Sequence, residues 1–204
     1  LYQIDLLSHK VIQHFDETNS PIGAAYNYKL ATKDGVLWVG SSAGLISFDI
    51  TERKWHVWGP KHTLGRKDIY TLYISENTIL IGTGSGLSTF DLSNHEFRHF
   101  DELNSGLKTD WVFDITPWHD DQYFVATDGG VYIFDAKHHK FEYLGITQGN
   151  AYSVLIEAIN KEQQDETLWV TSNNGVYRYS IKAGSAQVFK EDHGLSSNEH
   201  NLNA

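Results

Sequence analysis

Several residue types and patterns are missing from this sequence of 204 residues. It contains no cysteine and no methionine. Without cysteine, a disulfide scaffold, a thiolate metal site and a cysteine nucleophile are excluded. No run of about 18 apolar residues occurs, so we expect no membrane-spanning helix. The first residues do not read as a signal peptide, because no basic segment precedes an apolar one. With the initiator methionine also absent, we expect the sequence to be part of a longer chain.

Basic residues are in the minority. Lysine and arginine number 16 against 26 aspartates and glutamates, which gives a formal charge of −10. A nucleic-acid-binding protein needs a basic face that neutralises phosphates, and no lysine/arginine cluster supplies one, so that class is excluded. Apolar residues make up 40% of the chain, prolines number only three, and aromatic residues reach 13%. Aromatic sequence punctuated by glycine is typical of short strands and tight turns.

One unit of sequence recurs four times. Each copy has an apolar run, a glycine-containing turn and an alternating run that ends in an aromatic residue. The turn glycines are separated by 42, 44 and 45 residues, and the aromatic residues repeat at the same intervals. The glycines are Gly44, Gly86, Gly130 and Gly175, and the aromatic residues are Phe48, Phe90, Phe134 and Tyr179. A fifth, partial copy opens the chain, because Ile4-Asp5 lies 44 residues before Phe48-Asp49.

Each unit predicts four antiparallel strands, named A to D here in chain order. The turn between B and C contains glycine, for which the positive φ of a hairpin turn is cheap. Four strands in each repeat of this length match the period of a β-propeller blade. A helical repeat is excluded because no 3.6-residue apolar period is present. We therefore predict an all-β fold, a β-propeller of four-stranded antiparallel blades, with four full blades plus partial ones.

The repeat also predicts how the chain is divided. The whole of 1–204 forms one propeller region, with a partial blade at 1–15, full blades at 25–59, 68–101, 110–145 and 151–190, and the start of a further blade at 198–204. Strand D carries aromatic residues three apart, as in Trp55 and Trp58, which predicts a bulge or twist there. The aspartate after strand C, such as Asp91, is predicted to form the turn that follows.

The best-preserved copy resembles a known family. Residues 37–49 read Leu-Trp-Val-Gly-Ser-Ser-Ala-Gly-Leu-Ile-Ser-Phe-Asp, which resembles the two-component regulator propeller repeat. The segment Asp192-His-Gly-Leu-Ser-Ser-Asn198 is similar to the Gly-Leu-Pro-Ser-Asn segment between blades of that family, with Ser196 in place of proline. Individual copies depart from the pattern at Ala126, Thr171 and Ser180.

This resemblance implies a location and a set of partners. In that family the propeller is a sensor region outside the cytoplasm, followed by a transmembrane helix and an output module such as a histidine kinase or a diguanylate cyclase. Usually seven blades close the ring. The resemblance thus implies a periplasmic ectodomain, a fragment of a larger propeller, whose partners are the remaining blades and the output module. Open edges of an incomplete ring also predict self-association into a homo-oligomer.

Candidate ligand-binding residues lie where the chain enters strand A. The polar ones are Asp68, Asp110, Asn150 and Asn198, and the aromatic ones are Tyr26, Tyr70, Trp111 and Tyr152. The resemblance places them near the mouth of the central channel. Carboxylates and amides beside aromatic faces suit a small polyhydroxylated ligand such as an oligosaccharide, because the oxygens accept from hydroxyls and the rings stack on C–H faces. The alternative is that the polar residues cap loops and the aromatic residues pack between blades.

No cofactor, metal or catalytic residue is predicted. His95 and His99 are four apart in an extended segment, about 13 Å, which is too far for one metal ion. No glycine-rich loop leads from a strand into a helix, and no Gly-x-Ser-x-Gly elbow occurs. A sensor or ligand-binding region is the leading hypothesis, with a protein-interaction scaffold as the alternative. A propeller lyase or glycoside hydrolase is the third, and it would depend on Asp68 and Asp110.

Overall fold

The computed structural model describes residues 1–22, 26–58, 68–147, 149–157 and 166–198. Strands dominate these ranges, and the one helical element is the 3-10 turn η1 (Glu191–His193). No helix in the described part of the chain has the length and apolarity needed to cross a membrane. The predicted start of a further blade at 198–204 falls, apart from its first residue, outside the described residues.

The strands form one two-stranded sheet and four four-stranded antiparallel sheets. The first sheet pairs β1 (Tyr2–Ile4) with β2 (Val11–His14). The next contains β3 (Asn27–Lys33), β4 (Val36–Ser41), β5 (Gly44–Asp49) and β6 (Lys54–Trp58). The third contains β7 (Ile69–Ile74), β8 (Thr78–Thr83), β9 (Gly86–Asp91) and β10 (Phe97–Phe100). The fourth contains β11 (Val112–Pro117), β12 (Gln122–Thr127), β13 (Gly130–Asp135) and β14 (Lys140–Tyr143). The last contains β15 (Ala151–Glu157), β16 (Thr167–Ser172), β17 (Gly175–Ser180) and β18 (Ser185–Phe189).

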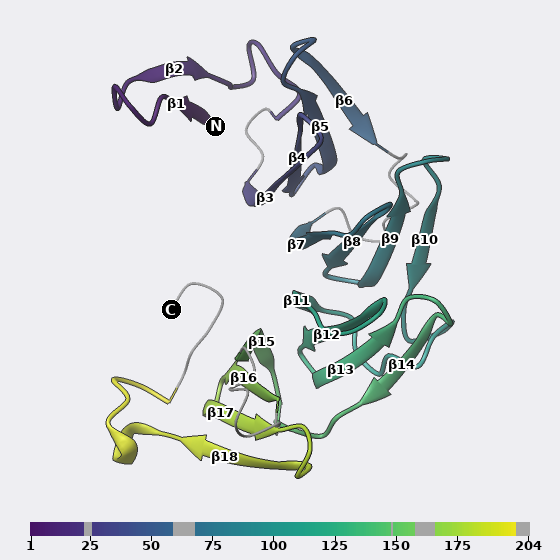
Figure 1. Cartoon of the computed structure of the whole chain (residues 1–204), viewed down its shortest axis with the longest axis vertical. Coiled ribbons are helices and arrows are strands. Elements are labelled where there is room, and N and C mark those ends of the chain that lie inside the picture. The colour runs from purple at the N-terminus through teal and green to yellow at the C-terminus, as the bar shows by residue number, and fades with distance from the viewer. Residues whose placement is uncertain (23–25, 59–67, 148, 158–165, 199–204) are drawn as a thin grey trace.

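The sheets fan out in an open arc (Figure 1). In each full sheet the strands are hydrogen-bonded in chain order. The first strands, β3, β7, β11 and β15, lie on the inside of the arc, and the fourth strands lie on its outside. Successive inner strands contact one another, β3 with β7, β7 with β11 and β11 with β15. The predicted four-stranded antiparallel blades are therefore confirmed.

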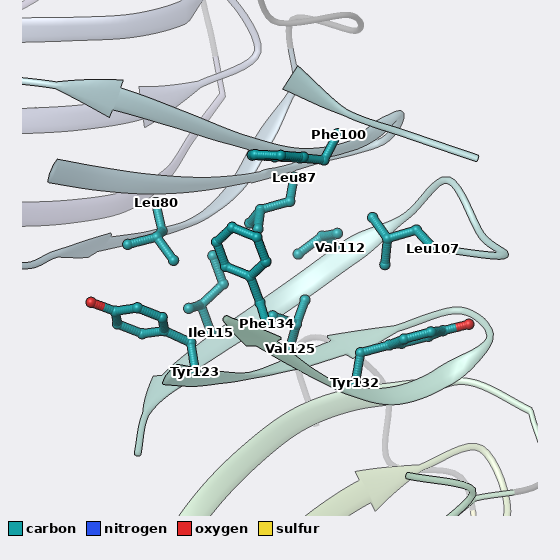
Figure 2. Close-up of a cluster of buried hydrophobic side chains, with 10 residues drawn as sticks. All are labelled: Leu80, Leu87, Phe100, Leu107, Val112, Ile115, Tyr123, Val125, Tyr132 and Phe134. Carbon is teal, nitrogen blue, oxygen red and sulfur yellow. The ribbon is translucent and has the colours of Figure 1, made fainter. Parts of the chain in front are cut away.

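The hydrophobic core lies between the sheets. Figure 2 shows one seam, in which Leu80, Leu87 and Phe100 of the β7–β10 sheet meet side chains of the β11–β14 sheet. The facing side chains include Val112, Ile115, Tyr123, Val125 and Phe134, and each is 5% exposed or less. Full burial of a large apolar side chain contributes about 1.5–3 kcal/mol, so these seams hold the sheets together.

Of the bulge or twist predicted in strand D, the bulge is wrong. The outer strands pair with their neighbours without any shift of register. Residues three apart in an extended strand lie on opposite faces. Trp55 accordingly packs on Phe15 of the preceding sheet, whereas Trp58 packs on Phe90 of the following one. The spacing of three therefore supplies one aromatic residue to each of two seams.

The turns between strands C and D reach back to the sheet before them. Each holds a residue at positive φ, Arg53 at 57°, His95 at 61° and His139 at 55°. Arg53 hydrogen-bonds to Gln13 of the β1–β2 sheet, and the ring of His95 lies 4.7 Å from that of Trp58. The Arg98 guanidinium of the preceding sheet donates a hydrogen bond to the His139 ring at 2.6 Å. A contact of this kind joins three of the four outer turns to the preceding sheet.

A buried hydroxyl closes each turn between strands B and C. The side chain donates to the carbonyl oxygen of the turn glycine and accepts an N–H from within the turn, as Thr83 does with Gly86 and Ser85. The four hydroxyls belong to Ser41, Thr83, Thr127 and Ser172, and all are fully buried. They recur at the repeat spacing of 42, 44 and 45 residues, a pattern visible in the sequence but not singled out there.

The aspartates after strand C form turns as predicted. The Asp91 carboxylate accepts hydrogen bonds from the backbone N–H and the hydroxyl of Ser93, at 2.7 and 2.6 Å. These bonds hold the pKa of Asp91 below its ordinary value. The side chain and backbone N–H of His138 lower the pKa of Asp135 in the same way. These carboxylates are therefore ionised in the folded protein down to lower pH than in the unfolded chain.

Replacing Gly86 with alanine is expected to destabilise the fold strongly. Gly86 has φ of 121°, and an added Cβ would overlap the carbonyl oxygen of Phe100 on the neighbouring strand. Gly35 (φ 77°) is the matched control, because no atom lies within 4 Å of its added Cβ. We expect Gly35→Ala to cost about 1–2 kcal/mol from backbone strain alone, and Gly86→Ala to cost about 3 kcal/mol or more. Urea unfolding measures both, and equal costs would contradict the predicted overlap.

The fold should lose stability in acid through the turn aspartates. Because the pKa of Asp91 is lowered by folding, its stabilising effect is complete above the unfolded value of 3.8 and disappears as pH falls through the folded value. Asp91→Asn keeps an oxygen acceptor but no charge, so the fall in stability below about pH 4 should be shallower. Denaturant unfolding from pH 2 to 7 tests this. Asp34→Asn, at a side chain 84% exposed, serves as control, and an equal change in both variants would refute the prediction.

Candidate ligand-binding site on the inner strands

Every inner strand carries a β-bulge near its start. In β7 the pairing passes from Ile69↔Thr83 to Thr71↔Gly82, so the register passes over Tyr70. The same shift occurs in the other three inner strands. The residues at the bulges are Tyr28, Tyr70, Phe113 and Tyr152. A bulge redirects the extra side chain and increases the local twist, so in the last three full sheets an aromatic ring is placed at the same point.

The bulge residues and Trp111 form a continuous aromatic strip. The rings of Tyr70 and Trp111 are stacked, with centroids 5.4 Å apart and planes 14° from parallel. The ring centroid of Phe113 lies 5.9 Å from that of Trp111 and 5.2 Å from that of Tyr152. We call Tyr70, Trp111, Phe113 and Tyr152 the aromatic strip. Its members belong to three successive inner strands, with Tyr70 on β7, Trp111 directly before β11, Phe113 on β11 and Tyr152 on β15. These strands line the inside of the arc (Figure 1).

Two carboxylates next to the strip accept hydrogen bonds from neighbouring strands and turns. Asp114 accepts hydrogen bonds from the Ser153 hydroxyl at 2.7 Å and the Val154 N–H at 3.1 Å, which joins β11 to β15. Asp128, in the turn after β12, accepts from the backbone N–H of Trp111 at 3.3 Å. These bonds place the ends of strand B and the starts of strand A on the same face of the arc.

Asp128 is electrostatically unusual. Partial burial raises the pKa of its carboxyl, the nearby charge of Asp110 acts in the same direction, and the bond from the Trp111 N–H opposes them. Close by, the buried hydroxyl of Thr109 has no hydrogen-bond partner in the described part of the chain. A buried polar group without a partner costs about 1–3 kcal/mol, so this hydroxyl lowers the stability of the fold locally.

The structure brings together most of the residues predicted for the site. Tyr70, Trp111 and Tyr152 belong to the strip, and the Asn150 amide donates to the Tyr152 hydroxyl at 3.0 Å. Asp110 is exposed directly before Trp111. The register refines their alignment, because Trp111, rather than Asp110, precedes its inner strand as Asp68 and Asn150 precede theirs.

Three predicted residues lie elsewhere or at the margin. Asp68 is half-buried just before β7. Tyr26 is 75% exposed, and its backbone exchanges hydrogen bonds with Ser42, at the opposite end of the row of inner strands from Tyr152. Asn198 accepts from the Glu191 N–H at 2.8 Å and so closes the turn η1.

Sequence reasoning missed Phe113, Asp114 and Asp128. In the sequence, Trp111 was taken as the aromatic residue equivalent to Tyr70. The register shows that Phe113 is the equivalent residue, and the bulge that makes it so does not change the hydropathy pattern. The spacing of bulge residues is the signal that identifies them, since Tyr28, Tyr70 and Phe113 stand 42 and 43 residues apart.

The site combines flat apolar faces with oxygen acceptors. Aromatic faces attract C–H groups, while carboxylate and amide oxygens accept hydrogen bonds from hydroxyls. Among the residues that the structure describes, no three histidine, aspartate or glutamate side chains gather in a way that could hold a metal ion. The chemistry of the strip fits a neutral molecule that has both apolar faces and hydroxyl groups.

The sequence and the structure were compared with known proteins. No protein-family model and no curated protein matches the sequence. Solved structures do match. The chain has the fold of a β-propeller. It superposes on the extracellular domain of BT4673 from B. thetaiotaomicron, assigned as a one-component system, with a TM-score of 0.66 and 19% identity over 86% of this chain and 23% of that chain.

Two other solved structures match as well. PorZ, a surface component of the type-IX secretion system of Porphyromonas gingivalis, gives a TM-score of 0.71 and 14% identity over 94% of this chain and 31% of that one. An ancestral GH74 enzyme gives a TM-score of 0.58 and 18% identity over 84% of this chain and 25% of that chain. The propeller therefore spans less than a third of the length of each of these structures. The extracellular domain of BT4673 is also described as part of a hybrid two-component system. This match is consistent with the resemblance of the sequence to the two-component regulator propeller repeat.

The raised pKa of Asp128 leads to a prediction about stability. A carboxyl with a raised folded pKa favours the fold below its unfolded value and opposes it as pH rises through the folded value. Asp128→Asn keeps an acceptor for the Trp111 N–H without the charge, so it should raise stability at pH 7 relative to pH 3. Thermal unfolding at both values tests this, and an equal loss of stability at the two pH values would contradict it.

Proposed function

We propose that this propeller is a non-catalytic ligand-binding region of an extracytoplasmic sensor, and that the aromatic strip binds a neutral oligosaccharide. One observation carries the proposal, namely the stacked Tyr70 and Trp111 rings continued by Phe113 and Tyr152 across three inner strands. Tyr70, Trp111 and Tyr152 are partly exposed, whereas Phe113 is only 7% exposed and packs between Trp111 and Tyr152. The three partly exposed rings can pack against the C–H faces of successive sugar rings.

Charge favours a neutral over an anionic ligand. The chain carries a formal charge of −10, and Asp110 and Asp128 stand beside the strip. An acidic sugar would bring like charge to these carboxylates, which costs binding free energy in a partly buried site. Hydroxyl groups of a neutral sugar can instead donate to Asp110 and to the amide oxygen of Asn150.

The neighbouring structures support the location and the class. BT4673 is described as an extracellular domain of a signalling system, and PorZ as a bacterial surface component. An ectodomain ahead of a membrane anchor and an output module fits this chain, and a ligand that binds one state better would shift the signalling equilibrium. The GH74 neighbour is an enzyme, so the experiment includes an assay for cleavage.

Trp111→Ala should weaken binding of a neutral hexasaccharide about tenfold, because it removes the central ring of the strip. The 204-residue chain is titrated by calorimetry with cellohexaose, maltohexaose and a hyaluronan hexasaccharide. Binding of at least one neutral sugar, with weaker or absent binding of the hyaluronan fragment, is expected. Tyr143→Ala, which removes an exposed ring on the outer strand β14, should leave the affinity unchanged.

Two results would overturn the proposal. Failure of every sugar to bind, or equal losses in Trp111→Ala and Tyr143→Ala, would remove the strip as the binding site. Shorter sugars appearing after overnight incubation with the chain, detected by chromatography, would contradict the non-catalytic assignment. Loss of that activity in Asp110→Asn would then assign the reaction to this carboxylate.

A further inference from the structure

A cavity opens on the outer side of the seam between the β3–β6 and β7–β10 sheets. It has a volume of about 390 Å³, within the range of roughly 300–1,000 Å³ that is usual for small-molecule sites. Its lining includes Trp38, Asp49, His56 and Trp58 of the first full sheet, and His95 of the turn between β9 and β10. Strand β6 lies on the outside of the arc (Figure 1), so this cavity is separate from the aromatic strip on the inner strands.

The register places the lining side chains on one face of the sheet. Trp38 of β4 pairs with Ser47 of β5, which pairs in turn with His56 of β6. Asp49 and Trp58 follow two positions later on their strands, and residues two apart in a strand point to the same face. That face is the one turned toward the β7–β10 sheet, because Trp38 and Trp58 both pack near Phe90 of β9.

Four rings form one wall of the cavity. The ring centroid of Trp58 lies 5.7 Å from that of Trp38, 4.0 Å from that of His56 and 4.7 Å from that of His95. The Trp58 indole N–H donates to the Ser47 hydroxyl at 2.7 Å, so this donor is satisfied within the protein. Tryptophan attracts cations through the face of its ring more strongly than the other aromatic residues do. The wall therefore favours a cationic group.

A carboxylate lies beside this wall. Asp49 accepts backbone N–H groups of Thr51 and Glu52 at 2.8 and 2.7 Å. Both bonds use Oδ1, so Oδ2 can accept a hydrogen bond from a ligand. Lys54 also lines the cavity, but its ammonium is held by Glu52 at 2.8 Å. Two carboxylates against one ammonium leave one negative charge here, which attracts a cation.

The next seam holds a guanidinium at the corresponding position. Arg98 of β10 is the counterpart of His56, because each pairs with the third residue after the turn glycine of its sheet. The Arg98 guanidinium reaches across that seam to His139, which has positive φ in its turn as His95 has. The shorter side chain of His56 instead lies against Trp58. The cavity thus lies where an arginine side chain stands one sheet further on.

We propose that this outer cavity binds a small molecule that carries a guanidinium group. The group lies against the Trp38 and Trp58 rings and donates to Oδ2 of Asp49. The His95 ring accepts from it, as the His139 ring accepts from Arg98. A guanidinium is planar, stacks on aromatic faces and has five N–H donors, so it can satisfy these partners at once. The proposal does not depend on sugar binding at the aromatic strip.

The test titrates the 204-residue chain by calorimetry with blocked arginine, Nα-acetyl-L-arginine amide. The matched compound is Nα-acetyl-L-citrulline amide, which has nearly the same shape without the charge. We expect saturable binding of blocked arginine at millimolar concentrations, and binding of blocked citrulline at least tenfold weaker. A blocked Gly-Arg-Gly peptide should bind no more tightly than blocked arginine, because the cavity holds one side chain.

Protein variants locate the site. Asp49→Asn keeps an acceptor for the turn and removes the charge, so it should weaken binding of blocked arginine at least tenfold. Asp135→Asn is the matched control, because Asp135 accepts a turn N–H in the same way two sheets further on, and binding should be unchanged. His56→Arg supplies the guanidinium from the protein itself and should abolish binding. Circular dichroism verifies that each variant is folded.

Four outcomes would overturn the proposal. These are absence of saturable binding, equal affinity for blocked arginine and blocked citrulline, equal effects of Asp49→Asn and Asp135→Asn, and unchanged binding in His56→Arg. Tenfold tighter binding of the Gly-Arg-Gly peptide would assign the cavity to a protein partner instead. Trp111→Ala should leave the affinity for blocked arginine unchanged, so a failure of sugar binding at the aromatic strip is distinguishable from a failure here.

Discussion

The contact of each inner strand with the small residue of the preceding sheet is the constraint on which the arc depends. At Gly40 the distance to Ile69 and Leu72 leaves no room for even a methyl group without movement of those side chains. Such closeness lets Ile69 become fully buried and Leu72 nearly so. Ala126, which is fully buried, shows that the third seam accepts one methyl group, where Val154 faces it in place of a leucine. Each seam is therefore fitted locally while the sheet-to-sheet arrangement repeats.

The candidate site is a by-product of the same inner strands. The bulge near the start of each strand changes the register after one residue, so the seam-facing residues keep their positions while an additional side chain turns away from the ladder. Asp114 then links neighbouring inner strands through Ser153 and Val154. The aromatic strip thus rests on a framework that is fixed by apolar packing and by carboxylate hydrogen bonds, which favours a preformed binding surface.

The sequence predicted the sheets well because the repeat fixes both strand period and turn position. The glycines at 44, 86, 130 and 175 sit at positive φ in the predicted turns, and the apolar runs before them form the second strands. The bulges were not predicted, since one residue passed over by the register changes no composition and is marked only by the spacing of 42 and 43 residues between Tyr28, Tyr70 and Phe113. The aromatic pair Trp55 and Trp58 was assigned to a bulge or twist because its role in two different seams depends on neighbouring sheets, which strand periodicity does not describe. Tyr70, Trp111 and Tyr152 were found from their place before or within strand A, whereas Phe113 required the register.

The bulge position in each inner strand has a consequence for how this surface can vary. Because the register passes over that position, a replacement there leaves the ladder of cross-strand pairs intact. Phe113 differs from Tyr70 and Tyr152 in lacking a hydroxyl, although all three occupy this position. The chemistry of the inner strands can therefore differ from sheet to sheet while the seams that hold the sheets together stay the same.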